Sequence, residues 1–191
     1  GVLMDPISRR TFSASVATGI VTASTVSAKT KAEAPVGPMV GHVSSSQAML
    51  WYRPSEVGTY SLTVRDTSGA QVMQATSQAL ADNDRCVTWE LSDLEPATRY
   101  RYEIQSNGKT IVAGDDYFFN TAPPDDSKSK ICLAFGSCAK NDPLPLWTQM
   151  ADRGAEGLVL LGDTPYIDST VLQIARQKHR QFLSIPELSK F

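Results

Sequence analysis

The chain has 191 residues, of which 41% are hydrophobic and 20% charged, and its 18 basic and 20 acidic side chains give a formal net charge of -2. This length is sufficient for one large domain or two small ones with a buried core. The near-neutral balance, without a block of Lys or Arg, argues against binding to nucleic acid or to an anionic membrane, and no run of about 18 apolar residues is present to span a bilayer.

Residues 1–28 are predicted to be an export signal. Arg9 and Arg10 precede a weakly apolar stretch, 13–26, which ends in the small-x-small pattern Val-Ser-Ala at 26–28. The paired arginines, followed by Phe12, resemble a twin-arginine signal, which directs bacterial proteins to the twin-arginine export machinery. We therefore expect a secreted or periplasmic protein. The alternative is a Ser/Thr/Ala-rich leader in which the arginine pair has no role.

Residues 36–121 have the pattern of an antiparallel β module. Short segments with alternating apolar residues, such as 48–53 and 60–65, are separated by turn residues about every ten positions, and no stretch shows an apolar period of 3.6. Segment 94–102 resembles the tyrosine corner of fibronectin type III domains, in which a Tyr hydroxyl bonds back to the chain, with Tyr100 as that tyrosine. The pattern predicts a fibronectin type III-like β-sandwich with most of its aromatic residues in the core.

Residues 122–130 are polar and Pro-rich, which predicts a linker, and residues 131–191 have an α/β pattern. The runs 131–135 and 158–161 are continuously apolar, as is typical of strands covered on both faces in a parallel sheet. Apolar residues recur at helical spacing between these runs and again in 171–183. We expect a β-α-β unit followed by a second helix, with Cys132 in the core of the first strand.

Both predicted strands are followed by residues with metal-binding chemistry. Cys138 follows the first on a Gly-Ser turn, and Asp163 and Tyr166 follow the second. Ligands of open α/β sheets bind at the carboxyl ends of the strands, so these three side chains can converge on one highly charged cation. A phenol with an ordinary pKa near 10 ionises at neutral pH only beside a strong Lewis acid. The alternatives are a buried structural thiol at Cys138 and an ordinary strand-end carboxylate at Asp163.

Phe-Gly-Ser-Cys at 135–138 and Gly-Asp-Thr-Pro-Tyr-Ile-Asp at 162–168 resemble motifs of the alkaline phosphatase D (PhoD-like) branch of the metallophosphoesterases. The order of leader, sandwich, linker and motifs is also similar to that family. The resemblance implies hydrolysis of phosphate mono- or diesters, small or polymeric, at a dinuclear Fe3+/Ca2+ site. In that site Cys138 and Tyr166 ligate the ferric ion, and Asp163 bridges it to calcium. Hydroxide is the implied nucleophile, and no catalytic side chain is assigned.

The family's further ligands have no counterpart here, because the two histidines, His42 and His179, lie in no matching motif. We therefore expect 131–191 to be the N-terminal part of a truncated metallophosphatase α/β domain, and the 191-residue chain to be inactive on its own. Two other functions remain open. One is a secreted β-sandwich binding module without a metal. The other is a purple-acid-phosphatase-like hydrolase, against which the Phe-Gly-Ser-Cys sequence counts.

Overall fold

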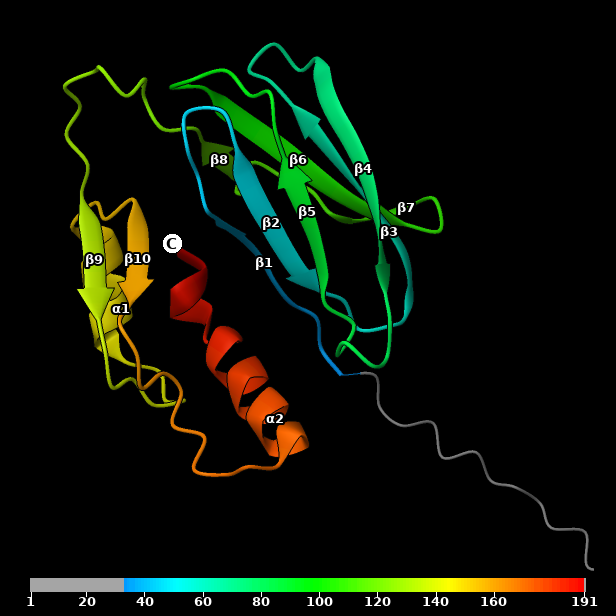
Figure 1. The fold of residues 1–191 in the computed structure, drawn as a ribbon, viewed down its shortest axis with the longest axis vertical. Coiled ribbons are helices and arrows are strands. Elements are labelled where there is room, and N and C mark those ends of the chain that lie inside the picture. Colours follow the sequence, from blue (N-terminus) through cyan, green and yellow to red (C-terminus); the bar gives the residue numbers. More distant parts are fainter. Residues whose placement is uncertain (1–32, 191) are drawn as a thin grey trace, which may run out of the picture. The chain divides into compact units, whose positions relative to one another are not determined.

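The computed structural model describes residues 33–190, so the predicted export signal at 1–28 lies outside the described residues. The described chain is mostly β-sheet with few helices (Figure 1). No helix within 33–190 is long and apolar enough to cross a membrane. The elements in chain order are β1 (Val36–Gly41), β2 (Ala48–Arg53), β3 (Gly58–Arg65), β4 (Gln71–Ala79), β5 (Val87–Leu91), β6 (Arg99–Ser106), β7 (Lys109–Val112), β8 (Phe118–Asn120), β9 (Leu133–Gly136), α1 (Pro145–Asp152), β10 (Gly157–Leu160), α2 (Leu172–Leu183) and the 3-10 helix η1 (Pro186–Lys190).

Strands β1 to β8 form two antiparallel sheets. One has the order β1-β2-β5, and the other has the order β4-β3-β6-β7 with β8 also paired to β6. Burial alternates along β5, where Val87, Trp89 and Leu91 are buried and the residues between them are exposed. Successive side chains of a strand point to opposite faces, so this alternation places one face of the sheet in the core. The strands predicted at 48–53 and 60–65 correspond to β2 and β3.

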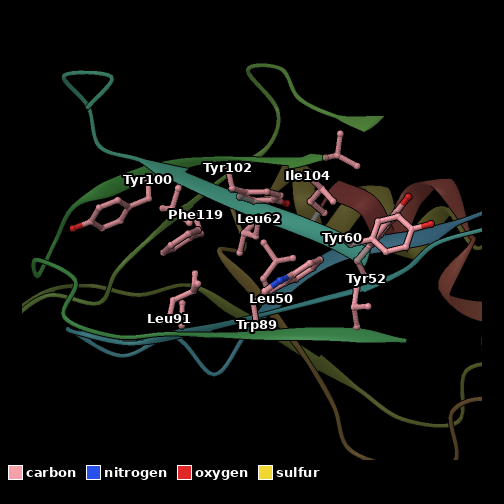
Figure 2. Packing of buried hydrophobic residues seen from close by; sticks show 14 of the residues in the cluster. Leu50, Tyr52, Tyr60, Leu62, Trp89, Leu91, Tyr100, Tyr102, Ile104 and Phe119 are labelled. Atoms are coloured by element: carbon pink, nitrogen blue, oxygen red, sulfur yellow. The ribbon is translucent and has the colours of Figure 1, made fainter. Parts of the chain in front are cut away.

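One hydrophobic cluster joins the inner faces of the two sheets (Figure 2). Leu50 and Trp89 come from the three-stranded sheet, and Leu62 and Ile104 come from the five-stranded sheet; all four are almost completely buried. Full burial of such a side chain contributes about 1.5–3 kcal/mol to folding. The residues with period-two spacing are therefore core residues, which confirms the prediction for the aromatic side chains at Trp89, Tyr100 and Tyr102.

The start of β6 is fixed by a side-chain bond to the preceding turn. The backbone N–H of Glu95 donates a hydrogen bond to the Tyr100 hydroxyl at 2.8 Å. The Tyr100 ring stacks on Phe119 of β8 with 5.4 Å between ring centroids, and the two residues are partners in the β6–β8 ladder (Figure 2). This geometry confirms the tyrosine corner that the sequence predicts at Tyr100.

Strands β9 and β10 are parallel, with Leu133 opposite Gly157 and Gly136 opposite Leu160. Helix α1 lies between them in sequence, so the three elements form a β-α-β unit (Figure 1). Helix α1 contacts α2 through Trp147 and Phe182, whose rings meet edge to face at 6.1 Å in a buried cluster. These two helices carry the second, smaller core of the described chain.

The prediction that both faces of β9 and β10 are covered is wrong for residues 33–190. Ala134 is buried and Leu158 packs against the helix core, whereas Leu133 and Val159 are exposed and Phe135 is 68% exposed. Alternate side chains of a strand point to opposite faces, so within this range only the face that carries Ala134 and Leu158 is covered. Cys132 is likewise exposed and is not the core residue that the apolar run predicts.

Candidate functional site

The loops that follow β9 and β10 run side by side beyond the two parallel strands. The N–H of Leu161 donates to the Gly136 carbonyl at 2.8 Å, and the N–H of Cys138 donates to the Gly162 carbonyl at 3.2 Å. Gly162 has φ 132°, a conformation that side chains rarely allow, and this glycine turns the chain out of β10. The backbone thus brings the residues after Gly136 next to those after Leu161.

Both loops hold a candidate ligand in the left-handed backbone region. Cys138 has φ 59° and Asp163 has φ 49°. For residues other than glycine this conformation costs about 1–2 kcal/mol relative to ordinary backbone. Aspartate tolerates the left-handed region better than cysteine does. Such conformations cluster at functional sites, where the surrounding structure holds them in place.

The three predicted ligands come together at this edge of the sheet. The Cys138 Sγ lies 3.9 Å from the Asp163 Oδ2. A hydrogen bond between the Tyr166 phenol and Cys138 raises the pKa of Tyr166 to about 12, and burial and the negative charges of Cys138, Asp163 and Asp168 act in the same direction. The phenol is therefore neutral at pH 7 in the protein alone.

This arrangement fits a metal ion bound to sulfur and oxygen. A first-row metal takes a thiolate at about 2.3 Å and a carboxylate oxygen at about 2.1 Å, so two such ligands of one ion lie at most about 4.4 Å apart. The 3.9 Å between Cys138 Sγ and Asp163 Oδ2 is within that limit. A cation of high charge would also favour the ionised form of the neighbouring Tyr166 phenol. Across residues 33–190, no group of three or more His, Cys, Asp or Glu side chains is placed to hold a metal.

A hollow of about 450 Å³ lies beside Cys138 and Tyr166, and its other lining residues are Lys140, Asn141, Asp168 and Lys178. Lys178 of α2 donates a hydrogen bond from Nζ to the Tyr166 carbonyl at 2.9 Å, and the same Nζ is 3.9 Å from the Asp168 Oδ2. Two ammonium groups therefore border a hollow that also carries a thiol, a phenol and a carboxylate. Sequence reasoning missed both lysines. Lys140 is two residues after Cys138 and could have been noted from the sequence, whereas Lys178 reaches the loop only through the placement of α2.

Among solved structures, one titled as the structure of PhoD matches with a TM-score of 0.64 and 20% identity. The match covers 82% of this chain and 36% of that chain, so this chain spans about a third of that protein's length. The described chain has a PhoD-like fold. At this identity the likeness shows the fold alone, and no family model and no curated protein matches the sequence.

Two shorter matches involve small β domains. The sensor domain of the anti-sigma factor RsgI4 from Pseudobacteroides cellulosolvens matches at 11% identity and a TM-score of 0.38, over 50% of this chain and 80% of that one. An FN3 domain of human collagen XX matches at 18% identity and a TM-score of 0.36, over 46% of this chain and 88% of that one.

Proposed function

We propose that this chain supplies the first metal-holding loops of a phosphate ester hydrolase. The observation that carries the proposal is the meeting of Cys138, Asp163 and Tyr166 on adjoining loops of a PhoD-like fold. In this proposal Cys138 and Tyr166 would hold a ferric ion, and Asp163 would be a ligand shared between that ion and calcium. Such an ion pair supplies Lewis-acid activation of a phosphoryl group.

The lysines of the hollow support an anionic substrate. Lys140 and Lys178 lie on the rim that also carries Cys138 and Tyr166. Ammonium groups form charge-assisted hydrogen bonds with phosphate oxygens, which are stronger than bonds between neutral groups. The Asp168 Oδ2 lies 3.9 Å from the Lys178 Nζ at the same rim. We propose that these lysines orient the phosphate ester, while the thiol, carboxylate and phenol hold the metal.

The exposed apolar face of β9 and β10 supports a larger protein. Phe135, Leu133 and Val159 leave large apolar side chains open on one side of a two-stranded sheet. Contiguous apolar patches of this kind usually mark a surface that another part of a protein covers. We propose that further polypeptide covers this face and supplies the remaining metal ligands, so that the 191-residue chain alone is inactive.

The proposal also includes the predicted organisation and location. Residues 36–121 form a fibronectin type III-like domain, 122–130 form the linker, and 131–191 belong to the metallophosphatase part. The twin-arginine pattern at 1–28 supports export to the periplasm or the exterior. The buried positions of Trp89, Tyr100 and Tyr102 do not favour an aromatic binding surface on the sandwich.

A titration of the 191-residue chain with ferric ion tests the ligand set. A phenolate bound to ferric iron gives a charge-transfer band in the visible range, and we expect this band in the wild type and its loss in Tyr166→Phe. Tyr117→Phe, which alters a tyrosine that packs on Tyr102 in the sandwich, is the matched control and retains the band. A wild type without the band, or Tyr166→Phe with it, would contradict the proposal.

A further inference from the structure

Helix α2 touches two different parts of the chain with its two opposite faces. On one face, Lys178 donates to the Tyr166 carbonyl at 2.9 Å, and Phe182 is buried against Trp147 of α1. On the other face, Arg176 Nη2 donates to the Asp82 carbonyl at 2.7 Å, and Arg180 bonds to the loop at 80–86. Residues two positions apart project about 200° apart on a helix, whereas residues four apart share a face. Helix α2 therefore connects the candidate site to the loop between β4 and β5.

Asp84 is the centre of the contact on the sandwich side. Arg180 Nη1 donates to both Asp84 carboxylate oxygens at 2.9 Å, and Arg53 donates from Nε and Nη2 at 3.2 and 3.1 Å. The Arg53 side chain is 1% exposed, and those of Asp84 and Arg180 are each 18% exposed. Glu33 joins the same network through Arg53, Arg85 and Arg180.

Burial disfavours the Asp84 carboxylate, but hydrogen bonds from Arg53 and Arg180 outweigh this and hold its pKa below the usual range. A network of this kind is not the simplest way to stabilise a contact, because apolar residues of similar size often stabilise as well or better. Unlike an apolar contact, this network consists of hydrogen bonds, whose strength depends on their direction. Arg53 holds the two Asp84 oxygens with two nitrogens, Nε and Nη2, and this paired geometry adds specificity. Arg180 donates to the same carboxylate from Nη1 and to Glu33 from Nη2 at 3.4 Å, so two of its nitrogens are held on the sandwich side of α2.

We propose that Asp84 and Arg180 are positioning residues for the candidate site. The pair holds α2, α2 places Lys178, and Lys178 holds the loop at 162–168 through the Tyr166 carbonyl. The sandwich then serves as part of the framework of the site and not as a separate binding module. That the loop at 162–168 belongs to a metal site rests on the proposed function, whereas its coupling through α2 to the loop at 80–86 does not.

Hydrogen exchange of the 191-residue chain, measured without metal, tests this coupling. In Arg180→Met, Asp84 keeps both bonds from Arg53, so the sandwich loop stays paired. We expect the amides of Cys138 and Ala139, which donate to Gly162 and Thr164 of the second loop, to exchange about tenfold faster, as for the loss of one hydrogen bond to a charged group, while β3 and β6 keep their protection. Arg180→Lys, which retains the charge, should restore part of the protection.

Arg65→Met is the matched control, because it removes an exposed ion pair with Glu103 inside the sandwich and should leave the amides of Cys138 and Ala139 unchanged. Asp84→Asn, which weakens the pair from the other side, should speed exchange at these two amides as Arg180→Met does. Unchanged exchange at both amides in both variants would overturn the inference. In Arg180→Met, faster exchange spread evenly over β3 and β6 would overturn it too, because that result shows a general loss of stability.

A ferric ion titration of the same variants separates the two proposals. If the wild type binds ferric ion, Arg180→Met should bind it several-fold more weakly and Arg180→Lys should recover part of the affinity. Unchanged affinity in Arg180→Met would overturn the positioning role. If the wild type binds no ferric ion, the proposed function fails, and the exchange rates alone decide whether Asp84 and Arg180 control the loop.

Discussion

Tyr100→Phe isolates the energetic contribution of the tyrosine corner. The substitution keeps the ring, its stacking on Phe119 and its burial, and it removes only the oxygen that accepts the Glu95 N–H bond at 2.8 Å. A buried donor left without a partner costs about 1–3 kcal/mol. Glu95 is itself exposed, so water can partly replace the lost acceptor, and we expect a loss of about 1–2 kcal/mol in the free energy of unfolding. For a chain of this size that loss lowers Tm by about 2–8 °C.

Urea unfolding at 25 °C, followed by tryptophan fluorescence, measures this loss, and Tyr102→Phe is the control. Tyr102 lies two residues further along β6 with its side chain on the same face, and burial raises the pKa of its hydroxyl well above the usual value. Within residues 33–190 that hydroxyl makes no hydrogen bond of the kind seen at Tyr100, so its loss should change stability by less than about 0.5 kcal/mol. Equal effects of the two substitutions would refute the role of the corner bond.

Three further substitutions test other parts of the structure. Asp84→Asn should lower the free energy of unfolding at pH 7 by about 2–3 kcal/mol. The difference from the wild type should shrink as the pH falls below about 4, because the Asp84 carboxylate contributes stability only while it is ionised. Urea unfolding at pH 7, 5 and 3 measures this difference in free energy, and a difference that stays constant refutes the reasoning. Phe182→Ala should cost the helix core about 3–5 kcal/mol and speed amide exchange in α1 and α2 but not in β3, whereas intact protection of both helices would contradict the packing. Cys138→Ser should weaken ferric ion binding at least about tenfold, and Cys132→Ser, at another exposed thiol, should not; metal retained after gel filtration shows whether the two variants differ.

The sandwich strands could be predicted from sequence because their signal is local. The apolar segment at 48–53 predicts β2 with the bounds that the structure shows, the alternation of apolar and polar residues at 60–65 predicts most of β3, and the turn at 94–98 predicts the bond to Tyr100. Each of these features depends on residues within about ten positions of one another. No long-range contact has to be known to recognise them.

The ion network could not be predicted in this way. Asp84 bonds to Arg53 at a separation of 31 positions and to Arg180 at a separation of 96 positions. Arg53 ends an apolar strand and resembles any exposed strand-end arginine, yet its side chain is 1% exposed. Its two carboxylate partners come from the segment before β1, which carries Glu33, and from the loop at 80–86, which carries Asp84. A charged side chain becomes recognisable as buried only after the elements around it are placed.

The apolar runs at 131–135 and 158–161 show a different limit of sequence reasoning. A continuous apolar run predicts that both faces of a strand are covered, but it does not say which segment covers them. In residues 33–190 the helix core covers the face of Ala134 and Leu158, while Phe135 and Val159 remain open. The sequence pattern therefore carries information about contacts that this part of the chain does not make, which is the physical basis for proposing a further covering segment.

The meeting of Cys138 and Asp163 could be predicted because the ends of two paired parallel strands lie together, whereas the contacts of Lys178 could not. Cys138 and Asp163 follow paired strands, so the register of β9 and β10 brings them together whatever the rest of the fold does. Lys178 bonds to the loop after β10, and Arg180, two residues further on, bonds to Asp84 on the opposite face of the helix. The candidate side chains thus meet through the local β-α-β unit, and the proposed support comes from a contact to the sandwich, so loss of the Asp84 contact should loosen the loop while leaving the paired strands in place.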